Sequence, residues 1–181
     1  MRIIRDNTTA VIIDVQERLL PHMDRKEHTI DRIVTLVRGL NTLGIPMTLT
    51  EQYPKGLGPT VPELVDAFET PPQPMIKATF SCCDDQPFLE HLRSQERTAV
   101  IVAGIEAHVC VLQTTIDLLE LGFLPFVVMD AVSSRSALDR EIAARRIEAE
   151  GGRLTTVESL LFELTRISGS EEFKAISRLV K

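Results

Sequence analysis

Residues 99–110 read AVIVAGIEAHVC, and this stretch decides the fold class. Its first five residues are all apolar, which is typical of a strand buried on both faces of a parallel sheet. Gly104 ends the run, and a helical pattern then extends over residues 109–121, where Gly122 closes it. A buried strand followed at once by a helix is the repeating unit of parallel α/β folds.

The same alternation extends along the rest of the chain. Further strands are expected at residues 10–13, 45–49, 75–76, 126–129 and 153–156, and further helices at 30–40, 88–92, 136–150, 157–164 and 173–179. About six strands that alternate with helices predict a three-layer α/β/α sandwich with a central parallel sheet, Rossmann-like in its connections. Residues 53–74 are rich in Pro and Gly and predict a long loop with a short helix at 63–68. Asp84 or Asp85 is expected to cap one helix and Ser136 another.

Length and composition place the chain among ordinary globular proteins. Its 181 residues, 44% hydrophobic and 25% charged, predict a single domain over residues 1–181. No apolar run approaches the ~18 residues that span a bilayer, so no membrane partner is expected. The net charge of -6, the lack of a basic block and an aromatic content of only 4% argue against nucleic-acid binding.

The cysteines and the start of the chain bear on location. Three cysteines cannot all pair, and the first residues carry no signal-peptide pattern, so reduced thiols and a cytoplasmic location are expected. Cys82 and Cys83 are expected to be small residues in a turn, with sensitivity to oxidation as the alternative.

Three chemically distinct side chains stand directly after predicted strands. Asp14 follows the first strand, with Gln16 two residues on, Lys77 follows the third and Cys110 follows the fourth. The carboxyl ends of parallel strands meet at one edge of the sheet, where such folds bind ligands. Each residue alone has an ordinary structural explanation as a helix cap, a solvated charge or a small core residue. Their joint placement is what favours an active site.

A carboxylate, an ammonium and a thiol can together carry out acyl transfer. Cys110 is expected in the first turn of its helix, where the helix dipole and the charge of Lys77 lower the thiol pKa. Asp14, paired with Lys77, can take the thiol proton and return it to a leaving amine. Backbone amides between residues 104 and 110 can form an oxyanion hole.

The motifs that carry this chemistry are Asp14-Val15-Gln16, Lys77 before Phe80-Ser81, and Gly104 with Cys110-Val111 and Thr114. In this order and strand context they resemble the isochorismatase-like cysteine hydrolases, over nearly the whole chain. The segments 50–60 (TEQYPKGLGPT) and 104–107 (GIEA) look most like the subgroup called isochorismatase domain-containing proteins, which has no settled substrate.

The resemblance implies a role for each residue. Cys110 would be the nucleophile, Asp14 the general base and acid, and Lys77 the electrostatic partner of both. The backbone amides of Glu106 and Cys110 would form the oxyanion hole, next to a cis peptide between Ile105 and Glu106. The resemblance also favours a homo-oligomer.

The sequence departs from the family where metal-binding members carry an Asp-x-His pattern. Residues 50–54 contain no histidine. Four histidines occur elsewhere without metal-ligand spacing, namely His22, His28, His91 and His108. We therefore predict no metal and no cofactor, which argues against nicotinamidase activity. Isochorismatases proper cleave an enol ether and can lack the thiol, so Cys110 argues against that chemistry as well.

Gln16, Tyr53 and Phe80 are candidates for the substrate pocket, with ordinary packing as the alternative for the two aromatic residues. His108 stands two residues before Cys110. Residues two apart on a helix point to different faces, so a Cys–His dyad is not expected.

Two functions fit these observations. The first is a metal-independent cysteine hydrolase that acts on a small amide or related C–N substrate through a thioester at Cys110. The alternative is a binding or scaffold protein that retains the fold without catalysis, in which this thiol has ordinary reactivity. A flavodoxin- or receiver-like domain fits the strand–helix alternation but lacks the clustered acidic residues of receivers.

Overall fold

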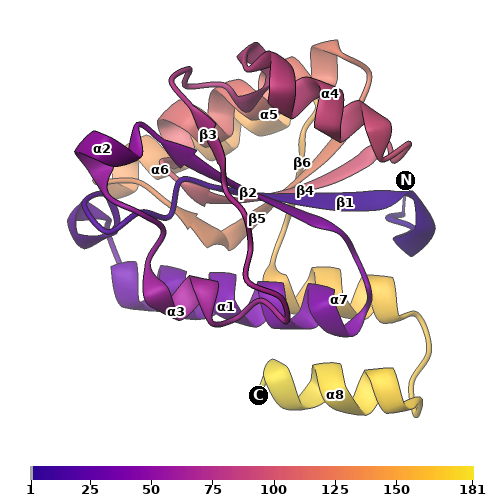
Figure 1. Cartoon of the computed structure of the whole chain (residues 1–181). Coiled ribbons are helices and arrows are strands. Elements are labelled where there is room, and N and C mark those ends of the chain that lie inside the picture. Colours follow the sequence, from indigo (N-terminus) through magenta and orange to yellow (C-terminus); the bar gives the residue numbers. More distant parts are fainter. Residues whose placement is uncertain (1) are drawn as a thin grey trace.

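The computed structural model describes residues 2–181, within which a six-stranded parallel sheet lies between layers of helices (Figure 1). The strands are β1 (Thr8–Ile13), β2 (Met47–Gln52), β3 (Met75–Lys77), β4 (Ala99–Ile105), β5 (Leu124–Ser133) and β6 (Arg153–Thr155). The helices are α1 (Lys26–Thr42), α2 (Pro54–Leu57), α3 (Pro62–Val65), α4 (Gln86–Ser94), α5 (Leu112–Glu120), α6 (Ala137–Ala149), α7 (Val157–Thr165) and α8 (Glu171–Leu179). The predicted three-layer α/β/α architecture is confirmed.

The order of the strands places the site residues. The sheet runs β3-β2-β1-β4-β5-β6, so the chain winds outward on one side of β1 and then returns to its other side. The winding direction reverses between β1 and β4, and at such a point the loops after the two strands diverge and leave room for a ligand. Asp14 directly follows β1, and Cys110 lies in the turn after β4.

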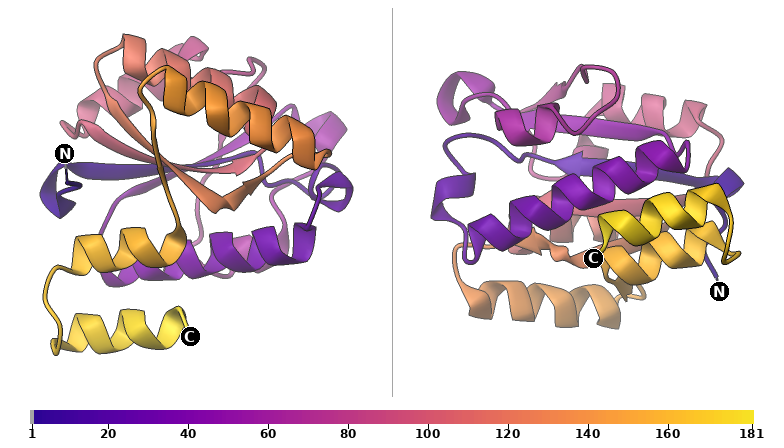
Figure 2. Two further views of the ribbon diagram at one scale, coloured as in Figure 1. Left: turned by 180° about the vertical axis from the view of Figure 1, so that it is seen from behind. Right: turned by 90° about the horizontal axis from the view of Figure 1, so that it is seen from below.

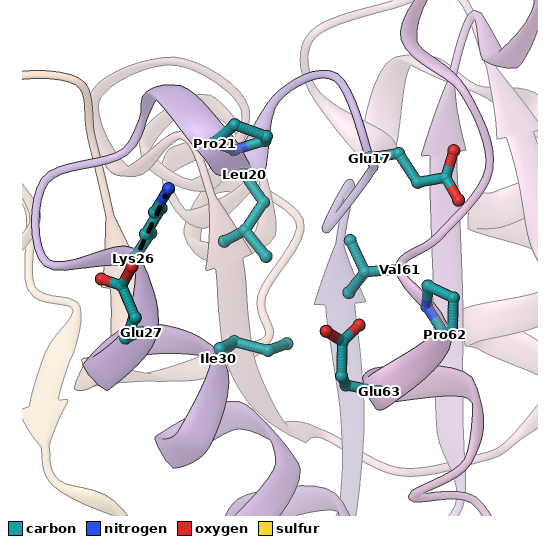
Figure 3. A pocket seen from close by; sticks show the side chains of 9 residues that line it. All are labelled: Glu17, Leu20, Pro21, Lys26, Glu27, Ile30, Val61, Pro62 and Glu63. Atoms are coloured by element: carbon teal, nitrogen blue, oxygen red, sulfur yellow. Dashed lines mark ion pairs between the residues drawn. The ribbon is translucent and has the colours of Figure 1, made fainter.

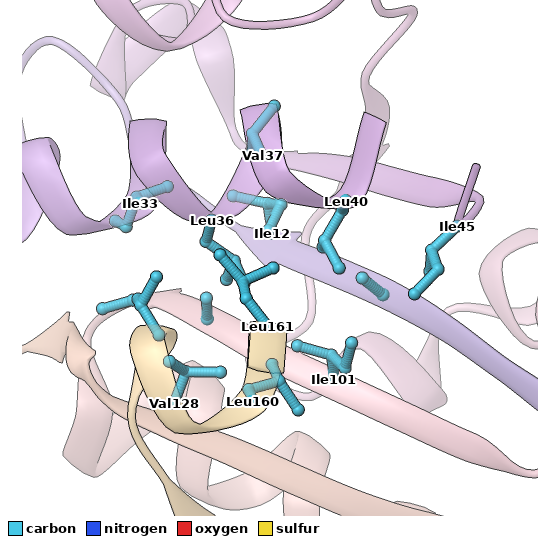
Figure 4. Packing of buried hydrophobic residues seen from close by; sticks show 14 of the residues in the cluster. Ile12, Ile33, Leu36, Val37, Leu40, Ile45, Ile101, Val128, Leu160 and Leu161 are labelled. Atoms are coloured by element: carbon cyan, nitrogen blue, oxygen red, sulfur yellow. The ribbon is translucent and has the colours of Figure 1, made fainter. Parts of the chain in front are cut away.

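The two faces of the sheet are covered by different helices (Figures 1 and 2). Helices α1 and α7 cover one face, α4, α5 and α6 cover the other, and α8 packs against α1 and α7. Side chains of β1 alternate between these faces, because successive residues of a strand point in opposite directions. Ile12 joins the cluster with Leu36 and Leu161 beneath α1 and α7 (Figure 4), whereas Val11 and Ile13 join the cluster on the opposite face. Full burial of each such aliphatic side chain contributes roughly 1.5–3 kcal/mol.

Several strands extend beyond the apolar runs that predicted them. β2 continues to Gln52, which pairs in register with Lys77 of β3, and β4 continues to Ile105, which pairs with Ser133 of β5. The hydrogen-bonded ladder therefore carries polar residues that the hydrophobic pattern does not mark. The Pro- and Gly-rich loop also contains two short helices, α2 and α3, where the sequence predicts one.

The predicted cap of α4 is confirmed, whereas the predicted cap of α6 and the segment after β4 differ from expectation. Asp85 caps α4 by accepting a 3.1 Å hydrogen bond from the backbone N–H of Phe88, whereas the side chain of Ser136 makes no such bond at α6. A π-type turn (Ala107–Val111) separates β4 from α5. Within residues 2–181, no helix combines the length and apolar character needed to cross a bilayer.

Candidate active site

Asp14 and Lys77 form a buried ion pair at the carboxyl edge of the sheet. Lys77 Nζ lies 2.6 Å from Asp14 Oδ2, and the two side chains are 2% and 0% exposed. Thr50 Oγ1 donates a 2.8 Å hydrogen bond to the other carboxylate oxygen, Oδ1. Asp14 has a positive φ of 51°, a conformation that Asp and Asn adopt more readily than most residues. Both carboxylate oxygens are thus held in a fixed direction.

The ammonium of Lys77 is surrounded by further acceptors. It donates to Gln52 Oε1 at 3.0 Å, to the carbonyl oxygen of Thr79 at 3.0 Å and to that of Phe80 at 3.2 Å. Burial lowers the pKa of Lys77, but the Asp14 carboxylate and neighbouring sulfur groups together raise the pKa above its ordinary value. The lysine therefore stays charged at neutral pH.

The thiol of Cys110 lies beside this pair. Its Sγ is 3.2 Å from Gln52 Oε1, and the residue is 6% exposed. Burial raises the pKa of the Cys110 thiol, Asp14 raises it further, and Lys77 lowers it by less. The expected lowering of the pKa is wrong, because Cys110 lies in the π-type turn rather than in the first turn of an α-helix and desolvation exceeds the attraction of the ammonium. The thiol is protonated at neutral pH and needs a base to react.

Gln52 joins the lysine to the thiol, and sequence reasoning missed it. Its Oε1 is the shared acceptor of Lys77 Nζ and Cys110 Sγ. The apolar run predicts that β2 ends before Gln52, so the pairing of Gln52 with Lys77 across β2 and β3 cannot be read from the pattern. Gln52 could have been identified as a polar residue that closely follows the apolar run at 45–49, since residues just beyond such a run lie at the carboxyl edge of the sheet.

Gln16 braces this region instead of presenting its amide to a ligand. Gln16 is fully buried, and its side chain forms two hydrogen bonds with the main chain of Gln52. Gln16 Nε2 donates to the Gln52 carbonyl oxygen at 3.0 Å, and the Gln52 backbone N–H donates to Gln16 Oε1 at 2.8 Å. Its Nε2 also donates to the carbonyl oxygen of Gly58 at 2.7 Å. Gln16 therefore ties the end of β2 to the following loop.

A second buried carboxylate holds the same loop. Glu51 Oε1 accepts hydrogen bonds from the backbone N–H of Thr60 at 2.7 Å and from its hydroxyl at 2.8 Å. Thr60 also forms an isolated antiparallel bridge with Gln16. The loop between residues 53 and 60 is thus fastened at both of its ends beside the ion pair.

The turn after β4 contains the cis peptide between Ile105 and Glu106. The carboxylate of Glu106 pairs with Arg135, whose Nε lies 2.9 Å from Oε1. This ion pair borders an open hollow of about 590 Å³ that the loop after β1 also lines. Leu19, His22 and Met23 of that loop form its remaining lining, and Glu106, which directly precedes the thiol turn, is its link to the candidate site.

The aromatic candidates lie mainly on the surface. Tyr53 is 62% exposed and Phe80 is 54% exposed, so neither ring is packed in the core. Phe80 contributes its carbonyl oxygen to Lys77. His108 Nδ1 lies 2.9 Å from Ser134 Oγ, which gives this ring a partner other than the thiol.

The two neighbouring cysteines are structural in their contacts. Cys82 and Cys83 are buried in a 3₁₀ turn after β3, and the backbone N–H of Cys82 donates to Thr114 Oγ1 at 2.9 Å. Burial raises the pKa of each of these thiols to about 12. Among the residues that the structure describes, no group of three or more His, Cys, Asp or Glu side chains is arranged to hold a metal ion.

A separate hollow of about 360 Å³ lies between the loop after β1 and the starts of α1 and α3 (Figure 3). Leu20, Ile30 and Val61 form apolar walls, and the carboxylates of Glu17 and Glu63 lie at its border. None of the ion pair, the thiol or the Gln52 amide lines it. The hollow beside Glu106 is not lined by these groups either, and Glu106 is the candidate site residue that borders it.

Residues 8–159 match the family described as the isochorismatase domain. The chain belongs to the isochorismatase family. It is 38% identical over 185 residues to the secreted isochorismatase effector Isc1 of Phytophthora sojae, covering 99% of this chain and 87% of that protein. This isochorismatase-family protein is also similar to the structure described as the MAR1 ribonuclease from Caenorhabditis elegans. The two share 40% identity and a TM-score of 0.93, covering 99% of this chain and 92% of the other.

Two bacterial structures share the fold at lower identity. YcaC from Pseudomonas aeruginosa, described with hexane-2,5-diol and covalent acrylamide, has a TM-score of 0.90 and 28% identity, over 97% of this chain and 89% of its own. The YcaC gene product from Escherichia coli, described as an octameric hydrolase of unknown specificity, has a TM-score of 0.87 and 25% identity, over 92% and 83%. Membership of the isochorismatase family supports a hydrolase.

Proposed function

We propose that this isochorismatase-family protein is a metal-independent cysteine hydrolase that cleaves a small amide or related C–N substrate through a thioester at Cys110. One observation carries the proposal. The thiol and the buried Asp14–Lys77 pair share a single acceptor, Gln52 Oε1, at the point where the loops after β1 and β4 diverge. A carboxylate, an ammonium and a thiol are thereby connected in one small volume.

The first half-reaction forms the acyl enzyme. Cys110 Sγ attacks the carbonyl carbon while its proton passes to Asp14, and the carbonyl electron pair moves onto oxygen. The backbone N–H groups of Glu106 and Cys110 stabilise that oxyanion. As the carbonyl re-forms, the C–N bond breaks and Asp14 returns the proton to the leaving amine. The raised thiol pKa is the reason that a base is needed in this step.

The second half-reaction releases the acid. Water attacks the thioester carbonyl carbon and gives a proton to Asp14, the C–S bond breaks, and the thiolate of Cys110 takes that proton back. Lys77 remains charged throughout and keeps the carboxylate of Asp14 in place. The products are a carboxylic acid and an amine, and the enzyme returns to its starting state.

One bacterial relative is described with covalent acrylamide, which supports a reactive nucleophile in this family. Acrylamide is a small carboxamide with an electrophilic double bond, and thiolates are the side chains that add to such groups most readily. The adduct is consistent with a reactive nucleophile in that protein. The competing function, a scaffold without catalysis, gives no reason for a buried ion pair beside a thiol.

Self-association and a cytoplasmic location belong to the same proposal. The octameric relative supports a homo-oligomer of this chain. The three cysteines are unpaired in the structure, as expected in a reducing compartment, although one relative is named as a secreted protein. Light scattering on the purified protein measures its self-association, and a dimer or larger assembly is the expected result.

The function is tested by trapping the acyl enzyme. The protein is incubated with a library of small amides and esters, and intact mass spectrometry followed by peptide mapping reports any adduct on Cys110. Cys110→Ala is expected to abolish both the adduct and amine release, while Cys83→Ala, a control that removes another buried thiol, retains both. Turnover that survives in Cys110→Ala refutes the proposal. RNA is included as a substrate, and cleavage of RNA that persists in Cys110→Ala would assign a different activity.

A further inference from the structure

Gln52 stands between the charged pair and the thiol, and its orientation is fixed by chemistry. An ammonium has only donors, so the atom of the Gln52 side chain at 3.0 Å from Lys77 Nζ must be the carbonyl oxygen. The same oxygen lies 3.2 Å from Cys110 Sγ. The thiol is therefore the donor in that contact, and Gln52 Oε1 competes for its proton with the Asp14 carboxylate, which also hydrogen-bonds the thiol.

The position of the carboxamide is fixed as well. Gln52 pairs in register with Lys77, which sets the two side chains side by side on neighbouring strands. The fully buried Gln16 binds both the N–H and the carbonyl oxygen of the Gln52 main chain. The carboxamide therefore leaves its place only by giving up the lysine.

We propose that Gln52 is a positioning residue that holds the Cys110 thiol in a protonated resting state, from which the proton must turn away before Asp14 can accept it. The inference rests on the proposed function for the identity of the nucleophile. The inference goes beyond that function because it gives a role to Gln52, a neutral residue that takes no proton in the proposed reaction. Its effect is to decide which acceptor the thiol proton faces before substrate arrives.

The physical reason is the polarity of a carbonyl oxygen. Its partial negative charge stabilises an S–H donor and repels a thiolate, so the contact favours the protonated form. Three other titratable groups act on the thiol, namely Asp14 directly after β1, Lys77 at the end of β3 and Cys82 in the turn after β3. Gln52 adds a neutral acceptor to this set and shares the ammonium with Asp14 and with the carbonyl oxygens of Thr79 and Phe80.

The proposal is tested through the pH dependence of Cys110 alkylation, which requires no substrate. The rate of carboxamidomethylation by iodoacetamide is measured by peptide mass, which separates Cys110 from Cys82 and Cys83. Gln52→Met keeps the length of the side chain and removes the acceptor, and Gln52→Glu replaces it with a carboxylate. Gln86→Met, on the surface of α4, is the matched control.

The two variants are expected to shift the alkylation midpoint in opposite directions. Gln52→Met lowers it by about 0.7 pH unit, the equivalent of one net neutral hydrogen bond. Gln52→Glu raises it, because a second carboxylate then faces the thiol, and Gln86→Met leaves it unchanged. A loss of structural support alone would move both Gln52 variants the same way, and that result, or no shift in either, overturns the proposal.

Folding and the hydrolase assignment are controlled separately. Thermal unfolding followed by circular dichroism identifies a variant that has lost its structure. If Gln52→Met does not fold, Gln52→Glu decides alone, since an upward shift supports the proposal and an unchanged or lowered midpoint overturns it. A wild-type protein without amidase activity refutes the proposed function, whereas the alkylation midpoints still report on Gln52.

Discussion

Removing one partner of the Asp14–Lys77 pair is expected to destabilise the protein more than removing both. In Lys77→Met the carboxylate of Asp14 stays fully buried, and the hydroxyl of Thr50 is the partner that it retains. An unpaired charge of this kind costs about 3–5 kcal/mol. That loss is a large part of the roughly 5–15 kcal/mol by which a domain is stable.

The double variant Asp14→Asn/Lys77→Met removes both charges and leaves no buried ion. Asn tolerates the positive φ of position 14 and can still accept the hydrogen bond of Thr50. Replacing a whole buried pair is often neutral or stabilising relative to breaking it, so the double variant is expected to recover at least ~2 kcal/mol over Lys77→Met.

The assay is urea unfolding at pH 7 followed by far-ultraviolet circular dichroism, because the chain has no Trp and one Tyr to report by fluorescence. Wild type, both single variants and the double variant complete a thermodynamic cycle. Lys174→Met, which breaks the exposed pair with Glu171, is the control and is expected to change stability by less than about 1 kcal/mol. Losses that simply add in the double variant would refute the coupling that the 2.6 Å contact implies.

Three further outcomes are expected. Because burial and Asp14 raise the thiol pKa of Cys110, its alkylation rate should keep increasing above pH 9, and Asp14→Asn, which removes a negative neighbour, should lower the pH midpoint of that increase. Gly104→Ala places a Cβ in collision with the backbone carbonyl oxygen of Ile13 in β1. Its midpoint of thermal unfolding should therefore fall by well over the few degrees expected for Gly122→Ala, where φ is positive but the space is open. Glu51→Gln weakens two hydrogen bonds to the loop at residue 60, and amide hydrogen exchange there should increase several-fold, while exchange in β4 stays unchanged.

The strands that lie in the centre of the sheet were the most predictable part of the fold. β1 and β4 are buried on both faces, so their apolar runs have an unambiguous cause. The ends of β2 and β5 were less predictable, because pairing with a neighbour holds polar residues such as Gln52 and Ser133 in extended conformation. The predicted capping by Ser136 was wrong, since a residue at the N-cap position satisfies the helix only if its side chain turns toward it.

Sequence alone placed Asp14, Lys77 and Cys110 at one edge of the sheet, because every strand of a parallel sheet ends at the same edge. Tertiary structure decided which of these side chains meet. The adjacency of β1 and β4, and the register that sets Gln52 beside Lys77, depend on strand order, which hydrophobic periodicity does not encode. Tertiary structure also decided that the pKa of the Cys110 thiol is raised. Desolvation depends on neighbours that are distant in the chain, and at Cys110 its effect on the pKa outweighs that of the nearby Lys77 charge.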